Sequence, residues 1–260
     1  MEPVQLPHEI LLHISAFSSG FGRSGSTLMQ QLMLHRPFYE YYTANRQYCI
    51  QMHTVTTTDA KRTAHTVFGK LHLEDGPAII YADGMQKWYL NGKFHREDGP
   101  AIIYSDSTQF WYRNDKYHRE DGPAVLFPNG TQYWYRNDIP HREDGPAIIS
   151  ADGERRWYLN GKLHREDGPA VINTNGEQCW YRNGELHRED GPAVITVGGK
   201  QCWYLNGLRH REDGPAIIHA SGRREWYRNN KYHREDGPAI VHASGRREWY
   251  RNGIRVKTSY

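Results

Sequence analysis

Residues 95–117 read HREDGPAIIYSDSTQFWYRNDKY, and this 23-residue pattern recurs along most of the chain. Every tryptophan follows the previous one by 23 residues, in the series Trp88, Trp111, Trp134, Trp157, Trp180, Trp203, Trp226 and Trp249. Self-similarity at a period of about 20–50 residues is typical of repeat architectures, in which stacking of neighbours supplies the core that one unit cannot build alone. The spacing predicts eight 23-residue repeats over residues 72–255.

Each repeat contains two turn signals, at residues 83–84 (Asp-Gly) and 91–92 (Asn-Gly) in the first copy. Such pairs between β-rich runs favour two-residue type I′ turns, because both central residues need a positive φ. Two-residue turns place Trp88 opposite Ile79 across the first turn and opposite His95 across the second. Each repeat is therefore predicted to be a β-hairpin.

Two architectures fit a 23-residue hairpin unit, a flat meander or a β-helix with one unit per coil. Equivalent residues lie ~4.8 Å apart in the coil but ~10 Å apart in the meander. The coil would stack like charges of the HRED segment on each other, whereas at ~10 Å their repulsion is largely screened. We therefore expect a mainly β protein, an elongated antiparallel β-meander of eight hairpin repeats preceded by a small α-helical N-terminal domain.

Composition excludes several classes of protein. The 33 Lys and Arg nearly balance the 30 Asp and Glu, which is not the basic surface of a nucleic-acid-binding protein. No apolar run approaches the ~20 residues of a membrane span, and the N-terminus lacks a secretory leader. Three cysteines without metal-ligand spacing indicate reduced thiols, so we expect a cytoplasmic or nuclear protein.

The HRED segment carries His, Glu and Asp within four residues, but its repetition argues against catalysis. Near-identical copies give near-identical environments, whereas acid–base chemistry needs two groups with different pKa values. His95 and Glu97 alone would leave a zinc ion short of its usual three or four protein ligands. We expect no enzyme activity, no catalytic residues, no metal and no cofactor; the segment is predicted to be a charged strand edge with Arg–carboxylate pairs.

The 23-residue step with Trp-Tyr-x-Asn-Gly, then His and Gly, then Asp-Gly, resembles the MORN repeat family over residues 72–255. The resemblance implies curved, elongated antiparallel sheets and the lipid binding proposed for that family. HREDGPA departs from the His-Gly-x-Gly of common MORN units, and repeats of this type resemble those of large DNA viruses of amoebae. For a viral protein the site of action would be the host cell.

The N-terminal residues 1–50 are predicted to be helical, because residues 6–17 place apolar side chains at helical spacing after a proline. The pattern LPxEILxxI resembles an F-box, which implies contact with a Skp-type adaptor through Leu6, Pro7, Ile10, Leu11 and Ile14. The alternative is a helical cap on the repeats. Residues 20–27 (GFGRSGST) approach a phosphate-binding loop but carry serine where its lysine belongs, and are interpreted as a linker. Residues 51–71 form a linker and degenerate half-repeat, and residues 256–260 a tail.

The patterns together predict a non-enzymatic protein-interaction scaffold, with the F-box-like segment indicating a substrate-recruiting subunit of a cullin-type ubiquitin ligase. Positions that vary between repeats are expected to contact the partner protein, namely Tyr104, Phe110, Phe127, Tyr133 and Arg156. The alternatives are a purely structural (virion) protein and a peripheral membrane-binding module. The membrane alternative would use the basic C-terminal repeats, with Arg223, Arg224, Arg246 and Arg247.

Overall fold

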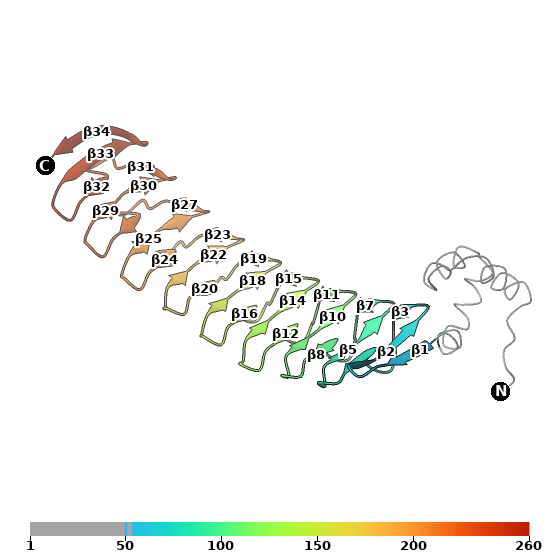
Figure 1. Cartoon of the computed structure of the whole chain (residues 1–260). Coiled ribbons are helices and arrows are strands. Elements are labelled where there is room, and N and C mark those ends of the chain that lie inside the picture. The colour runs from blue at the N-terminus through green and yellow to red at the C-terminus, as the bar shows by residue number, and fades with distance from the viewer. Residues whose placement is uncertain (1–49, 51–53, 260) are drawn as a thin grey trace, which may run out of the picture. The chain divides into compact units, whose positions relative to one another are not determined.

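The structure is a computed structural model that describes residue 50 and residues 54–259. All of the elements in this part of the chain are β-strands, β1 to β34 (Figure 1). The chain divides into two compact segments, Met1–Lys116 and Tyr117–Tyr260, which we describe separately. The predicted N-terminal helical domain lies outside the described residues, except for residue 50.

The first segment contains an antiparallel sheet in the order β1-β2-β4-β5-β8-β9, with β3 also paired to β2. Its strands are β1 (Thr54–Thr58), β2 (Arg62–Val67), β3 (Lys70–Leu71), β4 (Ile79–Tyr81), β5 (Gln86–Lys87), β8 (Ile102–Ile103) and β9 (Gln109–Phe110). Residues 65–72 repeat the pairing of a full unit without its tryptophan, since Thr66 pairs with Leu71 and the His72 N–H donates to the His65 carbonyl. His65 thus occupies the tryptophan position.

The second segment contains a sheet in which each strand pairs antiparallel with the next, from β12 to β34. Its strands are β12 (Val125–Leu126), β13 (Gln132–Tyr133), β16 (Ile148–Ile149), β17 (Arg155–Arg156), β20 (Val171–Ile172), β21 (Gln178–Cys179), β24 (Val194–Ile195), β25 (Gln201–Cys202), β28 (Ile217–Ile218), β29 (Arg224–Glu225), β32 (Ile240–Val241), β33 (Arg247–Arg251) and β34 (Ile254–Ser259). The predicted antiparallel meander of hairpins is confirmed.

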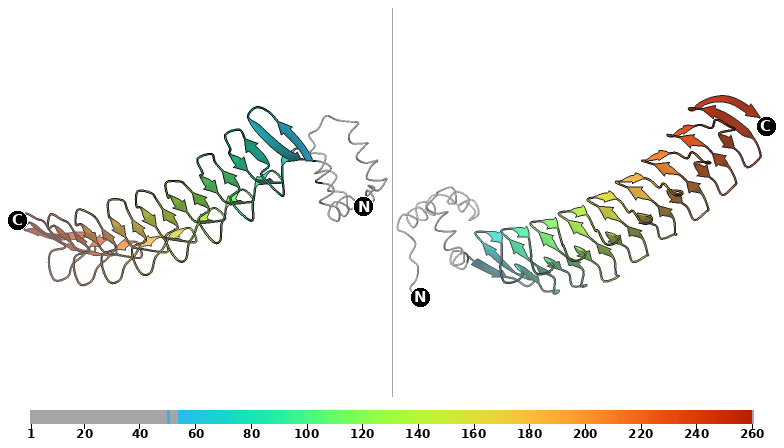
Figure 2. Two further views of the ribbon diagram at one scale, coloured as in Figure 1. Left: turned by 90° about the horizontal axis from the view of Figure 1, so that it is seen from below. Right: turned by 180° about the vertical axis from the view of Figure 1, so that it is seen from behind.

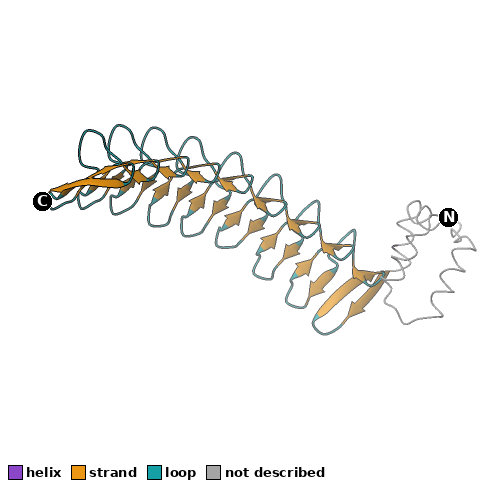
Figure 3. Ribbon diagram, turned by 90° about the horizontal axis from the view of Figure 1, so that it is seen from above, coloured by secondary structure: helices purple, strands orange, loops and turns teal. Residues whose placement is uncertain are grey.

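A second row of small two-stranded hairpins lies beside the sheet strands, one in each of the first seven repeats (Figures 2 and 3). In the first segment these are β6 (Tyr89–Leu90) with β7 (Lys93–Phe94), and β10 (Tyr112–Arg113) with β11 (Lys116–Tyr117). In the second segment they are β14 (Tyr135–Arg136) with β15 (Ile139–Pro140), β18 (Tyr158–Leu159) with β19 (Lys162–Leu163), β22 (Tyr181–Arg182) with β23 (Glu185–Leu186), β26 (Tyr204–Leu205) with β27 (Leu208–Arg209), and β30 (Tyr227–Arg228) with β31 (Lys231–Tyr232). The HREDGP segment between each hairpin and the next strand of the sheet is a loop, so the prediction that it forms a strand edge was wrong.

The turn at Asn91-Gly92 has the predicted geometry. Both residues have positive φ, 53° and 80°, and Tyr89 pairs with Phe94. The His95 N–H donates to the Trp88 carbonyl at 3.3 Å, so these two residues face each other as predicted. Asparagine recurs at this turn because it tolerates the left-handed region better than most residues.

The turn at Asp83-Gly84 differs from the prediction by one residue. The Gly84 N–H donates to the Tyr81 carbonyl, and Gly84 itself has a φ of 89°. This is a three-residue loop, a type I turn followed by one left-handed residue, which is a common alternative to the two-residue turn. Ile79 therefore pairs with Lys87, and the prediction that it faces Trp88 was wrong.

Cys179 and Cys202 allow the meander to be tested, because they occupy the same position in neighbouring repeats. Val194 pairs with both, so one whole strand lies between them, as predicted. The corresponding separation of ~10 Å exceeds the ~4.4–6.8 Å over which a disulfide forms. Burial also raises the pKa of the Cys179 thiol to about 11, which removes the reactive thiolate at neutral pH.

We therefore expect both thiols to survive treatment of the folded protein with a mild oxidant. Peptide mass spectrometry without reduction measures the yield of a Cys179–Cys202 bridge. Oxidation in denaturant is the control, in which the bridge can form. A high yield from the folded protein would show that equivalent positions stack directly, as in a β-helix.

Candidate functional site

At six of the tryptophans, an HRED loop holds an arginine against the indole ring. The Arg96 guanidinium lies 4.2 Å from the centre of the Trp88 ring, and its Nε donates to Asp98 at 2.9 Å. A Cβ on Gly99 would lie 2.8 Å from the Arg96 Cζ, so a larger residue there would displace the arginine from its place over the loop. The same arginine–tryptophan contact recurs at Arg142, Arg165, Arg188, Arg211 and Arg234. The predicted Arg–carboxylate pairs are confirmed, and their role is to hold the loop on the core.

The histidine of each loop joins successive repeats. The His95 Nδ1 accepts the backbone N–H of Asn114, in the turn of the next repeat, at 3.3 Å. The same Nδ1 lies 3.0 Å from the Asn114 Oδ1, and the Nε2 lies 2.9 Å from the Glu97 Oε1. These contacts are structural, and among residues 54–259 no three His, Cys, Asp or Glu side chains converge as metal ligands would.

Five aromatic side chains of the first segment form a connected, partly exposed cluster. We call it the aromatic face, and it consists of Tyr89, Phe94, Tyr104, Phe110 and Tyr112. The Phe94 ring centre lies 4.3 Å from that of Tyr89 and 5.3 Å from that of Tyr112. Phe110 lies 6.5 Å from Tyr112 and meets Tyr104 edge-on at 5.5 Å. Burial raises the pKa of the Tyr89 hydroxyl to about 12, so this hydroxyl is uncharged at neutral pH.

The second segment carries a comparable row of tyrosines. Each is the residue after a repeat's tryptophan, which gives Tyr135, Tyr158, Tyr181, Tyr204, Tyr227 and Tyr250. Tyr117 stacks on Tyr135 at 5.4 Å, and Phe127 meets Tyr133 edge-on at 5.9 Å. Most of these rings are half-buried, which leaves part of each accessible.

The residues predicted to face a partner lie beside these tyrosines, in pairs. Tyr104 contacts Phe110, and Phe127 contacts Tyr133. Arg156 donates to Glu154 at 2.6 Å. In two of these repeats the varying positions therefore contact each other, whereas Arg156 binds a glutamate two residues before it. The recurring tyrosines were not among the residues predicted to contact a partner; their step of 23 residues, next to the varying positions, was the available signal.

The basic C-terminal repeats hold two buried glutamates. Glu225 accepts hydrogen bonds from Tyr227 at 3.0 Å and Tyr232 at 3.1 Å, and pairs with Arg223 at 2.7 Å. Arg246 pairs with Glu248 at 3.0 Å. Of the four arginines predicted for membrane binding, Arg223 and Arg246 thus bind glutamates of their own repeats, while Arg224 and Arg247 are exposed. Membrane binding stays a prediction.

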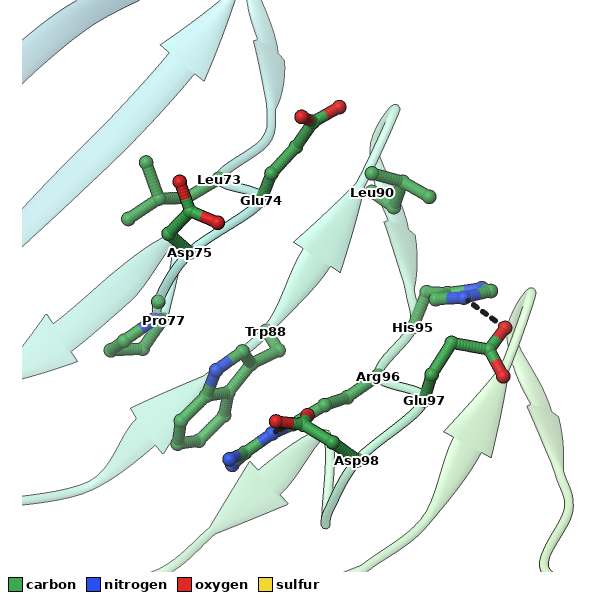
Figure 4. A pocket seen from close by; sticks show the side chains of 11 residues that line it. Leu73, Glu74, Asp75, Pro77, Trp88, Leu90, His95, Arg96, Glu97 and Asp98 are labelled. Atoms are coloured by element: carbon green, nitrogen blue, oxygen red, sulfur yellow. Dashed lines mark hydrogen bonds and ion pairs between the residues drawn. The ribbon is translucent and has the colours of Figure 1, made fainter.

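A hollow of about 700 Å3 lies between two successive loops of the first segment (Figure 4). It is lined by Leu73, Glu74, Asp75, Gly76, Pro77, Trp88, Leu90, His95, Arg96, Glu97 and Asp98. Figure 4 shows Trp88 between Pro77 and the Arg96 side chain, with carboxylates from both loops around it. None of these residues was predicted to bind a partner.

No protein-family model and no curated protein matches this chain. The described architecture, short antiparallel hairpins repeated every 23 residues, is consistent with a MORN-like repeat. Within residues 54–259, no helix has the length and apolar character needed to cross a membrane. The adaptor-binding residues predicted from the F-box resemblance, Leu6, Pro7, Ile10, Leu11 and Ile14, lie outside the described residues.

Proposed function

We propose that this protein is a non-enzymatic scaffold that binds a partner protein on its aromatic face. The observation that carries the proposal is the contact between recurring tyrosines and residues that vary from repeat to repeat, as at Tyr112 and Phe110. Tyrosine gives a large contact area with a polar hydroxyl at low cost in side-chain entropy, which is why it is enriched in protein interfaces. The varying neighbours would supply specificity.

The N-terminal segment would connect this scaffold to a second protein. Its LPxEILxxI pattern supports contact with a Skp-type adaptor, which would make the chain the substrate-recruiting subunit of a cullin-type ubiquitin ligase. The HREDGPA form of the MORN-like repeat supports an origin in a large DNA virus of amoebae, with action in the host cytoplasm or nucleus.

Affinity capture with the full chain tests both contacts in one experiment. The double variant Tyr104→Ser and Phe110→Arg introduces residues that other repeats carry at these positions, Ser150 and Arg156, so it is expected to fold. It should lose the partner and keep the adaptor, while Ile10→Asp should do the reverse. Lys116→Glu, an exposed change that matches Glu185, is the control and should keep both.

Quantitative mass spectrometry of the captured proteins reads the outcome. If the double variant captures the same proteins as the wild type, the aromatic face is not the binding surface. If no adaptor is captured by the wild type, the ligase role is wrong and the scaffold role is judged on the partner alone.

A further inference from the structure

Acidic side chains outnumber basic ones in the hollow between residues 73–77 and 95–98. Four carboxylates line it, from Glu74, Asp75, Glu97 and Asp98, against one guanidinium, from Arg96. That guanidinium is held by Asp98. The walls also include the apolar Leu73, Pro77, Trp88 and Leu90. The hollow is therefore negatively charged, and part of its wall is apolar.

One substitution in the repeat pattern accounts for part of this charge. Leu73 stands where every later loop carries an arginine, as Arg96 does in the next one. The aspartate two residues after that arginine is bound by it in each of the seven later loops, at Asp98, Asp121, Asp144, Asp167, Asp190, Asp213 and Asp236. Asp75 has no such guanidinium, and its side chain is exposed to solvent.

Other repeats show which group this kind of space binds. Leu90 aligns with Arg113, Arg182 and Arg228 in later repeats. These arginines bind glutamates of neighbouring loops: Arg113 donates to Glu97 at 2.6 Å, Arg182 to Glu189 at 3.1 Å and Arg228 to Glu235 at 3.4 Å. In three of the five later repeats with arginine at this position, the chain thus places its own guanidinium on the carboxylate of a loop glutamate.

We propose that the hollow binds an arginine side chain of the partner protein. The guanidinium would lie against Asp75 and Glu74, and the aliphatic stem against Leu73 and Leu90. Arginine fits better than lysine because its planar guanidinium pairs with carboxylates through two hydrogen bonds and is more weakly hydrated, which suits a half-apolar wall. The inference rests on the proposed function, since it assigns a specific residue type to the partner, but it concerns different side chains from the aromatic face.

The test uses the full chain and a short capped peptide with one arginine between alanines and glycines. Its control is the same peptide with citrulline, which keeps the shape and lacks the charge. Binding is followed by the NMR shift of the Trp88 indole N–H. We expect a saturable shift with the arginine peptide and none with citrulline. Asp75→Asn should weaken binding by on the order of tenfold, the size expected for one charged hydrogen bond.

The decisive variant is Leu90→Arg, which gives the first repeat the residue that Arg113 supplies in the second. It should fill the hollow and abolish peptide binding. Leu205→Arg, the same change at the equivalent position of another repeat, is the matched control and should leave the binding of the arginine peptide at Trp88 unchanged. Equal binding of the citrulline peptide, no binding to the wild type, or undiminished binding to Leu90→Arg would each overturn the proposal. None of these results would affect partner capture through Tyr104 and Phe110.

Discussion

Replacing Trp203 with alanine is expected to lower the free energy of unfolding by about 3 kcal/mol, the lower end of the range for buried Trp→Ala changes. The indole packs against a buried cluster formed by Cys202, Ala216, Ile217 and Tyr227. The Arg211 guanidinium lies over the same indole, 4.2 Å from the ring centre. The change therefore leaves a cavity and removes the surface on which the next loop rests.

Urea unfolding followed by circular dichroism measures the loss. Trp203→Phe is the control, because it keeps an aromatic surface for Arg211 and should cost clearly less. In a repeat protein each unit contacts only its neighbours, so a weakened unit can also uncouple the repeats on either side. An alanine variant as stable as the phenylalanine variant would contradict the assigned role of the arginine–tryptophan contact.

Replacing Glu225 with alanine should also destabilise the protein strongly, by about 3 kcal/mol, as for removal of one partner from a buried ion pair. The Glu225 side chain is only 7% exposed and holds Arg223 at 2.7 Å and His219 at 3.0 Å. Two tyrosine hydroxyls also donate to it. Alanine would leave all of these groups without their acceptor. Glu185→Ala, at an exposed position, is the control and should change stability little.

The same glutamate should make stability depend on pH. Burial acts to raise the pKa of Glu225, but the hydrogen bond from Tyr227 and the charge of Arg223 outweigh it, and the net shift is downward. A carboxyl whose pKa is lower in the folded than in the unfolded state stabilises the fold. This contribution is fully present above the unfolded pKa of about 4.3 and is lost as the pH falls through the pKa of the folded state. Thermal midpoints measured from pH 7 to pH 3 should therefore fall less steeply for Glu225→Gln than for the wild type. Parallel curves would show that Glu225 does not contribute.

The repeat and one of its two turns could be predicted from the sequence, because each depends on local chemistry. Asn91-Gly92 needs two positive φ values, and few other residue pairs tolerate them. The turn at Asp83-Gly84 allows either a two-residue or a three-residue loop, and the letters alone do not choose between them. That single residue decided whether Ile79 faced Trp88 or Lys87.

The site was harder to predict, because it depends on contacts between residues far apart in a repeat. The sequence indicated that Arg96 would pair with a carboxylate, but the stacking on Trp88 requires the loop to fold back over the sheet. The pairing of Tyr104 with Phe110 likewise depends on the register of the three-residue turn. The hollow could not be predicted, since its lining brings residues of two successive loops together with Trp88 and Leu90.

Radical footprinting of the full chain with its captured partner tests most directly whether the aromatic face binds protein. Oxidation of each exposed side chain, aromatic or not, is measured with and without the partner. We expect the partner to protect Tyr104, Phe110 and Tyr112, while Lys116, an exposed residue of β11, is labelled equally in both samples. Unchanged oxidation of the three rings in a saturated complex would contradict binding at the aromatic face.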